Sequence, residues 1–131
     1  MAQEDKELLL KDLCARLPYN VICQVEFKEN GKYNSKVMLL SGIFTDEAYF
    51  TTKGGSIYSN EYKPYLFPLS SMTEEEKEEY CQLQQRIIYN SKGSANEDVM
   101  KYINWCYKKY LDINNLIPMG LAIDATNLNI Y

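Results

Sequence analysis

Residues 21–40 read VICQVEFKENGKYNSKVMLL, and from Val21 to Phe27 every second side chain is apolar. Alternation with a period of two predicts a half-buried β-strand. Asn30-Gly31 follows, and this pair is a strong hairpin signal because a type I′ turn needs a positive φ angle at both positions. The sequence therefore predicts two antiparallel strands joined at residues 30–31, the second running to about Phe44.

A two-residue turn also fixes which residues lie opposite each other. Opposite charges then face each other beside the turn, and apolar side chains face each other deeper in the sheet, which is a consistent arrangement. The expected pairs are Glu29–Lys32, Cys23–Met38 and Val21–Leu40.

Two short strands are expected to extend this sheet, at residues 48–52 and 57–59, after turns at Thr45–Glu47 and Lys53–Ser56. The second turn, Lys53-Gly54-Gly55-Ser56, superficially resembles a phosphate loop. It lacks the glycine-lysine spacing of that motif and precedes a strand, so we interpret it as a hairpin turn. The result is a small antiparallel meander of three or four strands, either open against helices or curled into a half-barrel.

The N-terminal segment from Gln3 to Leu17 is predicted to form a helix that covers the sheet, and Pro18 ends it. Its leucines fall on one stripe and its charged residues elsewhere. The stripe contains Leu9, Leu10, Leu13 and Leu17, and Lys6, Lys11 and Asp12 are expected to point away from it.

Two further helices are predicted in the C-terminal half. Thr73 and Glu76 form a capping box that starts the first, which extends to about Tyr89. After a break at 90–93, Ser94 and Glu97 form a second box, and that helix runs to about Leu111. The first helix is expected to bury Tyr80, Leu83 and Ile87, with Ile88 a further candidate, and the second has one stripe made of Val99, Ile103, Cys106, Tyr107 and Tyr110. An extended tail with room for a final strand completes one α+β domain, residues 1–131.

The segment from Glu61 to Met72 connects the meander to these helices. It is rich in aromatic residues and contains Pro64 and Pro68. Because proline cannot donate a backbone hydrogen bond, two prolines argue against a central strand. We interpret the segment as an extended connector.

Composition narrows the functional classes. The chain has 131 residues and a net charge of −4, and this charge comes from one cluster, Glu74–Glu79, while the rest is neutral. No block of lysine or arginine could serve as a phosphate-binding footprint, which makes a nucleic-acid partner improbable. The start has no secretory signal and no apolar run is long enough for a membrane span, so we expect a cytoplasmic protein without membrane contact.

The residues that usually carry catalysis are scarce. The chain contains no histidine, which removes the usual general base and the commonest transition-metal ligand. Its four cysteines are scattered without a C-x-x-C pair, so we expect reduced, mostly buried thiols and no disulfide. We therefore expect a protein that is not an enzyme and holds no cofactor and no metal. The four cysteines are Cys14, Cys23, Cys81 and Cys106.

Twelve tyrosines are the least ordinary feature of the composition. Tyrosine combines an apolar ring with a polar tip and is enriched at protein interfaces. Several cluster near Lys63, and we take Tyr58, Tyr62, Lys63 and Tyr65 as a candidate interaction surface. Two other interpretations remain open: the rings fill the core and its boundary, or they form a stacking platform for single-stranded nucleic acid beside lysines.

The stretches Leu8–Tyr19, Lys63–Glu76 and Ile117–Ala125 resemble short proteins of gut Bacteroides-type bacteria and their phages. The resemblance spans the chain and implies an accessory protein of a phage or mobile element, but it brings no catalytic residues. Together with the tyrosines, it favours a non-enzymatic protein-interaction module with a protein partner or a second copy of itself. Single-stranded nucleic-acid binding is the alternative.

Overall fold

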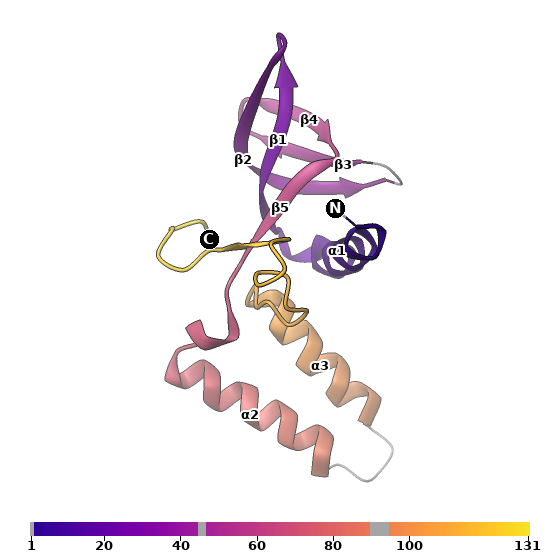
Figure 1. The fold of residues 1–131 in the computed structure, drawn as a ribbon. Coiled ribbons are helices and arrows are strands. Elements are labelled where there is room, and N and C mark those ends of the chain that lie inside the picture. Colours follow the sequence, from indigo (N-terminus) through magenta and orange to yellow (C-terminus); the bar gives the residue numbers. More distant parts are fainter. Residues whose placement is uncertain (1, 45–46, 90–94) are drawn as a thin grey trace.

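The structure is a computed structural model that describes residues 2–44, 47–89 and 95–131. Within these ranges the fold is α+β, with three α-helices and a six-stranded mixed sheet in the order β4-β3-β2-β1-β5-β6 (Figure 1). The sheet has more strands than the three or four expected. The helices are α1 (Gln3–Arg16), α2 (Glu74–Tyr89) and α3 (Ala95–Lys108), and the strands are β1 (Ile22–Glu29), β2 (Lys32–Ile43), β3 (Ala48–Thr52), β4 (Gly55–Ser59), β5 (Glu61–Leu66) and β6 (Ile123–Asp124).

The β1–β2 hairpin confirms the prediction made from residues 21–40. Asn30 and Gly31 have φ angles of 50° and 78°, both positive as a type I′ turn requires. Glu29 lies opposite Lys32, and Cys23 opposite Met38. The turn therefore determines the register of the two strands. In this register the alternating apolar side chains of β1 point into the core.

The turn between β3 and β4 is also a hairpin, as expected. Thr52 lies opposite Gly55, so that Lys53 and Gly54 form a two-residue loop and no phosphate loop is present at this point. Beyond β4 the sheet curls back toward β1, where the Ser59 hydroxyl donates a hydrogen bond of 2.5 Å to the Glu26 carbonyl. The predicted turn at Thr45–Glu47 includes residues 45–46, which lie outside the described residues.

The interpretation of residues 61–72 as a connector was wrong for their first half. Residues 61–66 form β5, which pairs antiparallel with β1 and parallel with β6. Proline is tolerated because β6 covers only Tyr65 and Leu66, so Pro64 has β1 alone as a neighbouring strand. The final strand left open for the tail is β6.

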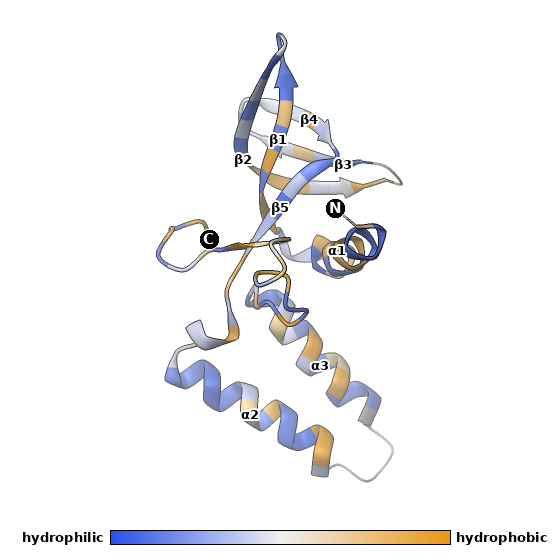
Figure 2. Cartoon of the chain, viewed as in Figure 1, coloured by the Kyte–Doolittle hydropathy of each residue, from blue (hydrophilic) through white to orange (hydrophobic). Residues whose placement is uncertain are grey.

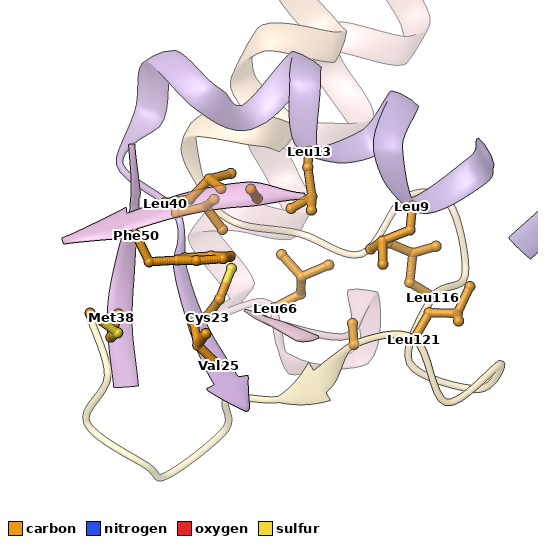
Figure 3. Packing of buried hydrophobic residues seen from close by; sticks show 13 residues of the cluster. Leu9, Leu13, Cys23, Val25, Met38, Leu40, Phe50, Leu66, Leu116 and Leu121 are labelled. Atoms are coloured by element: carbon orange, nitrogen blue, oxygen red, sulfur yellow. The ribbon is translucent and has the colours of Figure 1, made fainter. Parts of the chain in front are cut away.

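Helix α1 covers the inner face of the sheet and completes the core (Figure 3). Leu9 and Leu13 are buried there among side chains from β1, β2, β3 and β5. Asp12, expected to point away, is instead buried with a relative exposure of 1%. The prediction failed because Arg16, one turn later, is buried beside it and pairs with its carboxylate.

Helices α2 and α3 form a hairpin that projects from the sheet (Figure 1). The capping box of α2 is confirmed: the Glu76 amide donates to the Thr73 hydroxyl and the Thr73 amide to the Glu76 carboxylate, at 3.1 and 3.0 Å. The expected burial in α2 was wrong, because no residue of this helix is buried and its main packing partner is α3. Tyr80, Leu83 and Ile87 are half-buried, and Ile88 is exposed. The second box, at Ser94, lies outside the described residues.

Backbone pairing closes the root of this helical hairpin. Phe67 and Leu111 form a parallel bridge just before α2 and just after α3, and the Asp112 amide donates to the Phe67 carbonyl at 2.8 Å. The Asp112 carboxylate then accepts hydrogen bonds from the Leu116 and Ile117 amides. The hairpin is thus fixed at its root, while the rest of its length extends away from the sheet.

Candidate interaction surfaces

The four residues predicted to form one interaction surface lie in different environments. Tyr58 on β4 is 56% exposed, whereas Tyr65 on β5 is buried. Tyr62 is half-buried and packs its ring 5.2 Å from that of Phe50, inside the sheet. Lys63 is exposed. Successive side chains of a strand point to opposite faces, so the Tyr62 ring packs toward Phe50 while Lys63 points the other way, although both residues border one cavity beside β5. Because Tyr65 is buried, the four do not form a single exposed patch.

The burial of Tyr65 has a cause outside its own strand. The pairing with β6 and the C-terminal tail cover this end of β5, and the Tyr131 hydroxyl donates to the Tyr65 carbonyl at 2.8 Å. The Tyr131 ring stacks on that of Tyr110, with centroids 3.7 Å apart. Burial raises the pKa of both Tyr65 and Tyr131, so these phenols remain protonated at neutral pH and act as structural groups.

Tyr58 belongs instead to an aromatic cluster on the outer face of the sheet. Its ring lies 4.9 Å from that of Tyr49, the residue directly opposite on β3, and 5.8 Å from that of Phe44. Phe44 is 53% exposed. We call Phe44, Tyr49 and Tyr58 the outer aromatic cluster.

Sequence reasoning missed two members of the outer aromatic cluster. Phe44 follows a register shift between Leu40 and Gly42, a bulge that strand alternation does not reveal. The expected four-residue turn Lys53–Ser56 would place Thr51 opposite Tyr58, whereas the observed two-residue turn places Tyr49 there.

The α2–α3 hairpin is a second exposed surface. Tyr80 on α2 contacts Tyr102 and Trp105 on α3, with ring centroids 5.5 and 6.2 Å apart. The Trp105 indole donates to the Glu79 carboxylate at 2.9 Å. These contacts hold the two helices together without contributions from the sheet.

A buried ion pair with its hydrogen bonds, which we call the buried joint, connects helix α1 to the end of the α2–α3 hairpin. Arg16 donates to the Asp12 carboxylate through Nε and Nη2, at 2.5 and 3.1 Å, and through Nη2 to the Leu111 carbonyl at 2.6 Å. Asn114 donates to the same carboxylate at 2.8 Å. The Arg16 guanidinium also lies 4.7 Å from the centre of the Tyr107 ring. One ion pair on α1 therefore fixes the end of α3 and the segment after it.

Atom Nη1 of this arginine is buried without a hydrogen-bond partner among the described residues. The face of the Tyr107 ring offers a partial electrostatic substitute. Because every other contact of Arg16 is made inside the chain, we assign the joint a structural role.

Lys63 and Tyr62 also line a surface cavity of about 410 Å³ beside β5. Its charged side chains balance, two lysines against two glutamates, so it prefers neither an anion nor a cation. Burial raises the pKa of Tyr62, which makes its phenol a poor base at neutral pH. The other lining residues are Lys6, Gln24, Glu26, Asn60 and Glu61.

All four cysteines are unpaired, but the expectation that they are mostly buried holds for two of them only. Cys23 and Cys106 are buried, and Cys14 and Cys81 are exposed on α1 and α2. In the described part of the chain, no three acidic or cysteine side chains are placed to hold a metal ion together. No helix in these ranges is both long and apolar enough to cross a membrane.

With this geometry established, the chain was compared with known proteins. The comparisons with protein-family models, with curated proteins and with solved structures each gave no match.

Proposed function

We propose that this chain is a non-enzymatic protein-interaction module that binds its partner on the outer aromatic cluster. We further propose that it serves as an accessory protein of a phage or mobile element in a bacterial cytoplasm, as its resemblance to short phage and Bacteroides-type proteins implies. The observation that carries the first proposal is the contact of the Tyr58 ring with the rings of Phe44 and Tyr49 on the outer face of the sheet, where Tyr58 and Phe44 are exposed.

The outer aromatic cluster has the properties of a protein-binding anchor. Aromatic rings provide a large contact area with few rotatable bonds, so that little conformational entropy is lost on binding. The rings also restrict one another through their contacts. Small hydroxyl residues flank them, and Ser41 and Thr51 share a hydrogen bond of 2.8 Å. An apolar core with a polar rim is the usual composition of a protein interface.

The charges around the outer aromatic cluster favour a protein over a nucleic acid. A stacking platform for single strands combines aromatic rings with a positive groove. None of the cation–π contacts among the described residues involves a ring of the outer aromatic cluster. The exposed Glu47 lies beside the cluster, because its backbone carbonyl accepts a hydrogen bond of 2.9 Å from the Phe44 amide. We infer that the partner presents an apolar side chain with hydrogen-bond donors beside it.

Single-stranded nucleic acid remains a second candidate partner, supported by a different part of the sheet. In the β1–β2 hairpin, Lys28 lies 5.8 Å from the Tyr33 ring centre and Lys36 lies 5.7 Å from that of Phe27. A cavity of about 330 Å³ adjoins Phe27, Lys28 and Lys36 and extends to the turn before β4. Binding there must weaken steeply with salt. Absence of oligonucleotide binding at low salt would eliminate this candidate.

The protein-binding proposal is tested by comparing two tyrosines of similar exposure. Tyr58→Ala should abolish retention of a specific partner from bacterial lysate, whereas Tyr33→Ala, at the distant hairpin tip, should retain it. Tyr33 is 74% exposed and has no contact with the outer aromatic cluster. A partner retained equally by both variants, or by neither, would contradict the proposal.

A stability measurement excludes unfolding as the reason for lost binding. Tyr58→Ala should lower the free energy of unfolding by about 1 kcal/mol, the value of its aromatic contacts. Tyr65→Ala removes a buried ring and should cost about 3 kcal/mol or more. Urea titrations of the two variants distinguish these values.

A further inference from the structure

Strand β4, which carries Tyr58 of the outer aromatic cluster, lies at one edge of the sheet. In the described part of the chain its single neighbouring strand is β3, so the other side of β4 is unpaired. Gly55, Ser56 and Tyr58 are exposed. A strand with one free side presents backbone groups with which another extended chain can pair.

The register identifies the backbone groups on this free side. Thr52 and Gly55 close the two-residue turn, so they form a hydrogen-bonded pair. Hydrogen-bonded and non-hydrogen-bonded pairs alternate along an antiparallel ladder, which places Ser56 and Tyr58 in non-hydrogen-bonded pairs. Their N–H and C=O groups therefore point away from β3, where no other described strand adjoins β4.

The free edge of β4 also lacks the features that usually prevent pairing, which are charged residues, proline and bulges. Residues 55–59 include no charged residue and no proline, and their pairing with β3 has no register shift. Strand β5 is different, because it carries Glu61, Lys63 and Pro64 and is then covered by β6. Figure 2 shows the same contrast, since β4 lacks the deep blue with which β5 begins.

The cavity of about 330 Å³ adjoins the inner side of this edge. Ile57 lies opposite the buried Phe50 and therefore points to the inner face of the sheet, where it lines the cavity with Phe27 and Met38. A strand paired with β4 continues the alternation of faces. Its side chain opposite Ile57 would face the cavity, and its side chain opposite Tyr58 would lie on the outer face.

The charges at the cavity favour an acidic residue in the added strand. The charged side chains in the lining are those of Lys28, Lys36 and Glu29, two cations against one anion. Lys36 lies opposite the buried Val25 and therefore on the inner face. Among the described residues Lys36 has no ion pair, and its ammonium lies 5.7 Å from the Phe27 ring centre.

We propose that the partner of the outer aromatic cluster is an extended peptide segment, which adds to the free edge of β4 as a further strand. This inference rests on the proposed function and names the kind of partner. An apolar side chain of the segment enters the cavity beside Ile57, another apolar side chain packs beside Tyr58, and an acidic residue lies near Lys36. Backbone hydrogen bonds provide affinity, and the cavity and the rings select the sequence.

A second copy of this chain does not satisfy the same requirements. It can offer the edge of its own β4 or the start of its own β5. The inward side chains of these strands, Ile57 and Tyr62, already pack against the core of the copy to which they belong. They cannot also enter the cavity of a neighbour, whereas a segment outside a folded sheet can place its side chain there.

Peptide selection with edge variants tests the proposal. Linear random peptides displayed on phage are selected on the full chain, and the selected peptides are synthesised and titrated. Ser56→Pro removes the outward N–H group without removing a hydrogen bond to β3, so it should weaken peptide binding at least about tenfold. Ser56→Ala keeps this N–H group and is the matched control, which should bind like the unmodified chain. Circular dichroism shows that both variants are folded.

Amide hydrogen exchange of the unmodified chain gives a result that does not depend on a variant. The Ser56 and Tyr58 amides should exchange rapidly in the free chain and slowly with a selected peptide bound, and the Ile57 amide should exchange slowly in both states. Failure to select a peptide, or protection confined to other residues, would overturn the proposal. Protection that appears with protein concentration alone, or with an oligonucleotide and no peptide, would overturn it as well.

Comparison with Tyr58→Ala separates this inference from the proposed function. Loss of the cellular partner in both Tyr58→Ala and Ser56→Pro, with the partner retained by Ser56→Ala, would support strand addition. A partner lost by Tyr58→Ala and retained by Ser56→Pro would overturn strand addition and leave the proposed function standing. A partner retained by Tyr58→Ala would contradict the proposed function itself.

Discussion

At the scale of single residues, the Asp12–Arg16 pair is the feature with the largest expected effect on stability. Both side chains are fully buried, and together they connect α1 to Leu111 and Asn114. Arg16→Leu would leave the Asp12 carboxylate buried without its cation, which typically costs about 3–5 kcal/mol. Urea unfolding of the variant should show this loss. A loss below about 1 kcal/mol, within the range of surface substitutions and weak contacts, would contradict the buried joint.

The four thiols should separate into two classes of reactivity. Burial raises the pKa of Cys106 to about 11 and also raises that of Cys23, so both remain protonated at pH 8. Because the thiolate is the reactive form, only the exposed Cys14 and Cys81 should react quickly with a thiol reagent in the native protein. All four should react after unfolding. Fast reaction of a third thiol in the folded state would contradict the placement of these residues.

Residue patterns predicted some of these positions and not others. The positive φ angles at Asn30 and Gly31 follow from local turn chemistry, which two adjacent residues specify. The burial of Asp12 does not, because it also depends on where Arg16 lies in the fold and on a partner as distant in sequence as Asn114. A tertiary partner of this kind leaves no signal in the periodicity of α1.

At the scale of elements, the β1–β2 hairpin depends on its turn. Gly31→Val places a β-branched residue at a φ angle of 78°. Strain of this kind costs on the order of 1–2 kcal/mol. A lowered melting temperature should be accompanied by unchanged far-UV circular dichroism at low temperature. Gly54→Ala is a suitable comparison, since Gly54 has open space around its Cα and no positive φ angle. Equal melting temperatures for the valine variant and the unmodified chain would contradict the type I′ turn.

The start of α2 depends on its capping box. Thr73→Ala removes the hydroxyl that accepts the Glu76 amide, and such caps contribute about 1 kcal/mol. Glu76→Gln keeps a side chain that can still accept the Thr73 amide, so it should cost less. Comparison of the two variants by urea unfolding checks the cap. A glutamine variant as destabilised as the alanine variant would argue that the charge, and not the box geometry, stabilises this helix end.

Strand β5 shows why element prediction failed where it did. Its two neighbours, β1 and β6, are far apart in sequence, and β6 has only two residues. Proline is excluded from strand positions that have a hydrogen-bonded strand on each side. Pro64 has a neighbouring strand on one side only, so the rule does not apply to it. The burial of Tyr65 depends on the same pairing, because β6 covers this end of β5.

At the scale of the whole molecule, the buried phenols and thiols should make the protein labile in alkali. Burial raises the pKa of Tyr62, Tyr65 and Tyr110 above the ordinary value of 10.0 and that of Cys106 above 9.0. Above these values the unfolded chain releases protons that the folded chain retains. The free energy of unfolding should therefore be highest below pH 9 and fall as the pH rises toward 11.

Urea titrations between pH 7 and pH 11 measure this dependence, and phenolate absorbance gives an independent check. The buried phenols should ionise only as the protein unfolds. Ionisation of every tyrosine near its ordinary pKa, without loss of structure, would contradict the burial of these rings.

The projecting hairpin is a property of the whole molecule that the sequence patterns could not reveal. The apolar stripes of α2 and α3 predicted two amphipathic helices, and periodicity alone cannot say whether a stripe faces the sheet or a neighbouring helix. The Phe67–Leu111 bridge determines this, because it closes the root and directs both helices away from the core. The exposure of Ile88, Tyr89 and Met100 follows from that arrangement.

The central claim is that the outer aromatic cluster binds a protein, and site-specific photo-crosslinking in cells that produce the chain tests it most directly. A photoreactive residue at position 58 should yield a discrete crosslinked product containing another protein. The same residue at position 33, which is exposed and lies outside the cluster, should yield none. A product at both positions, or at neither, would contradict the assignment of Phe44, Tyr49 and Tyr58 as the binding surface.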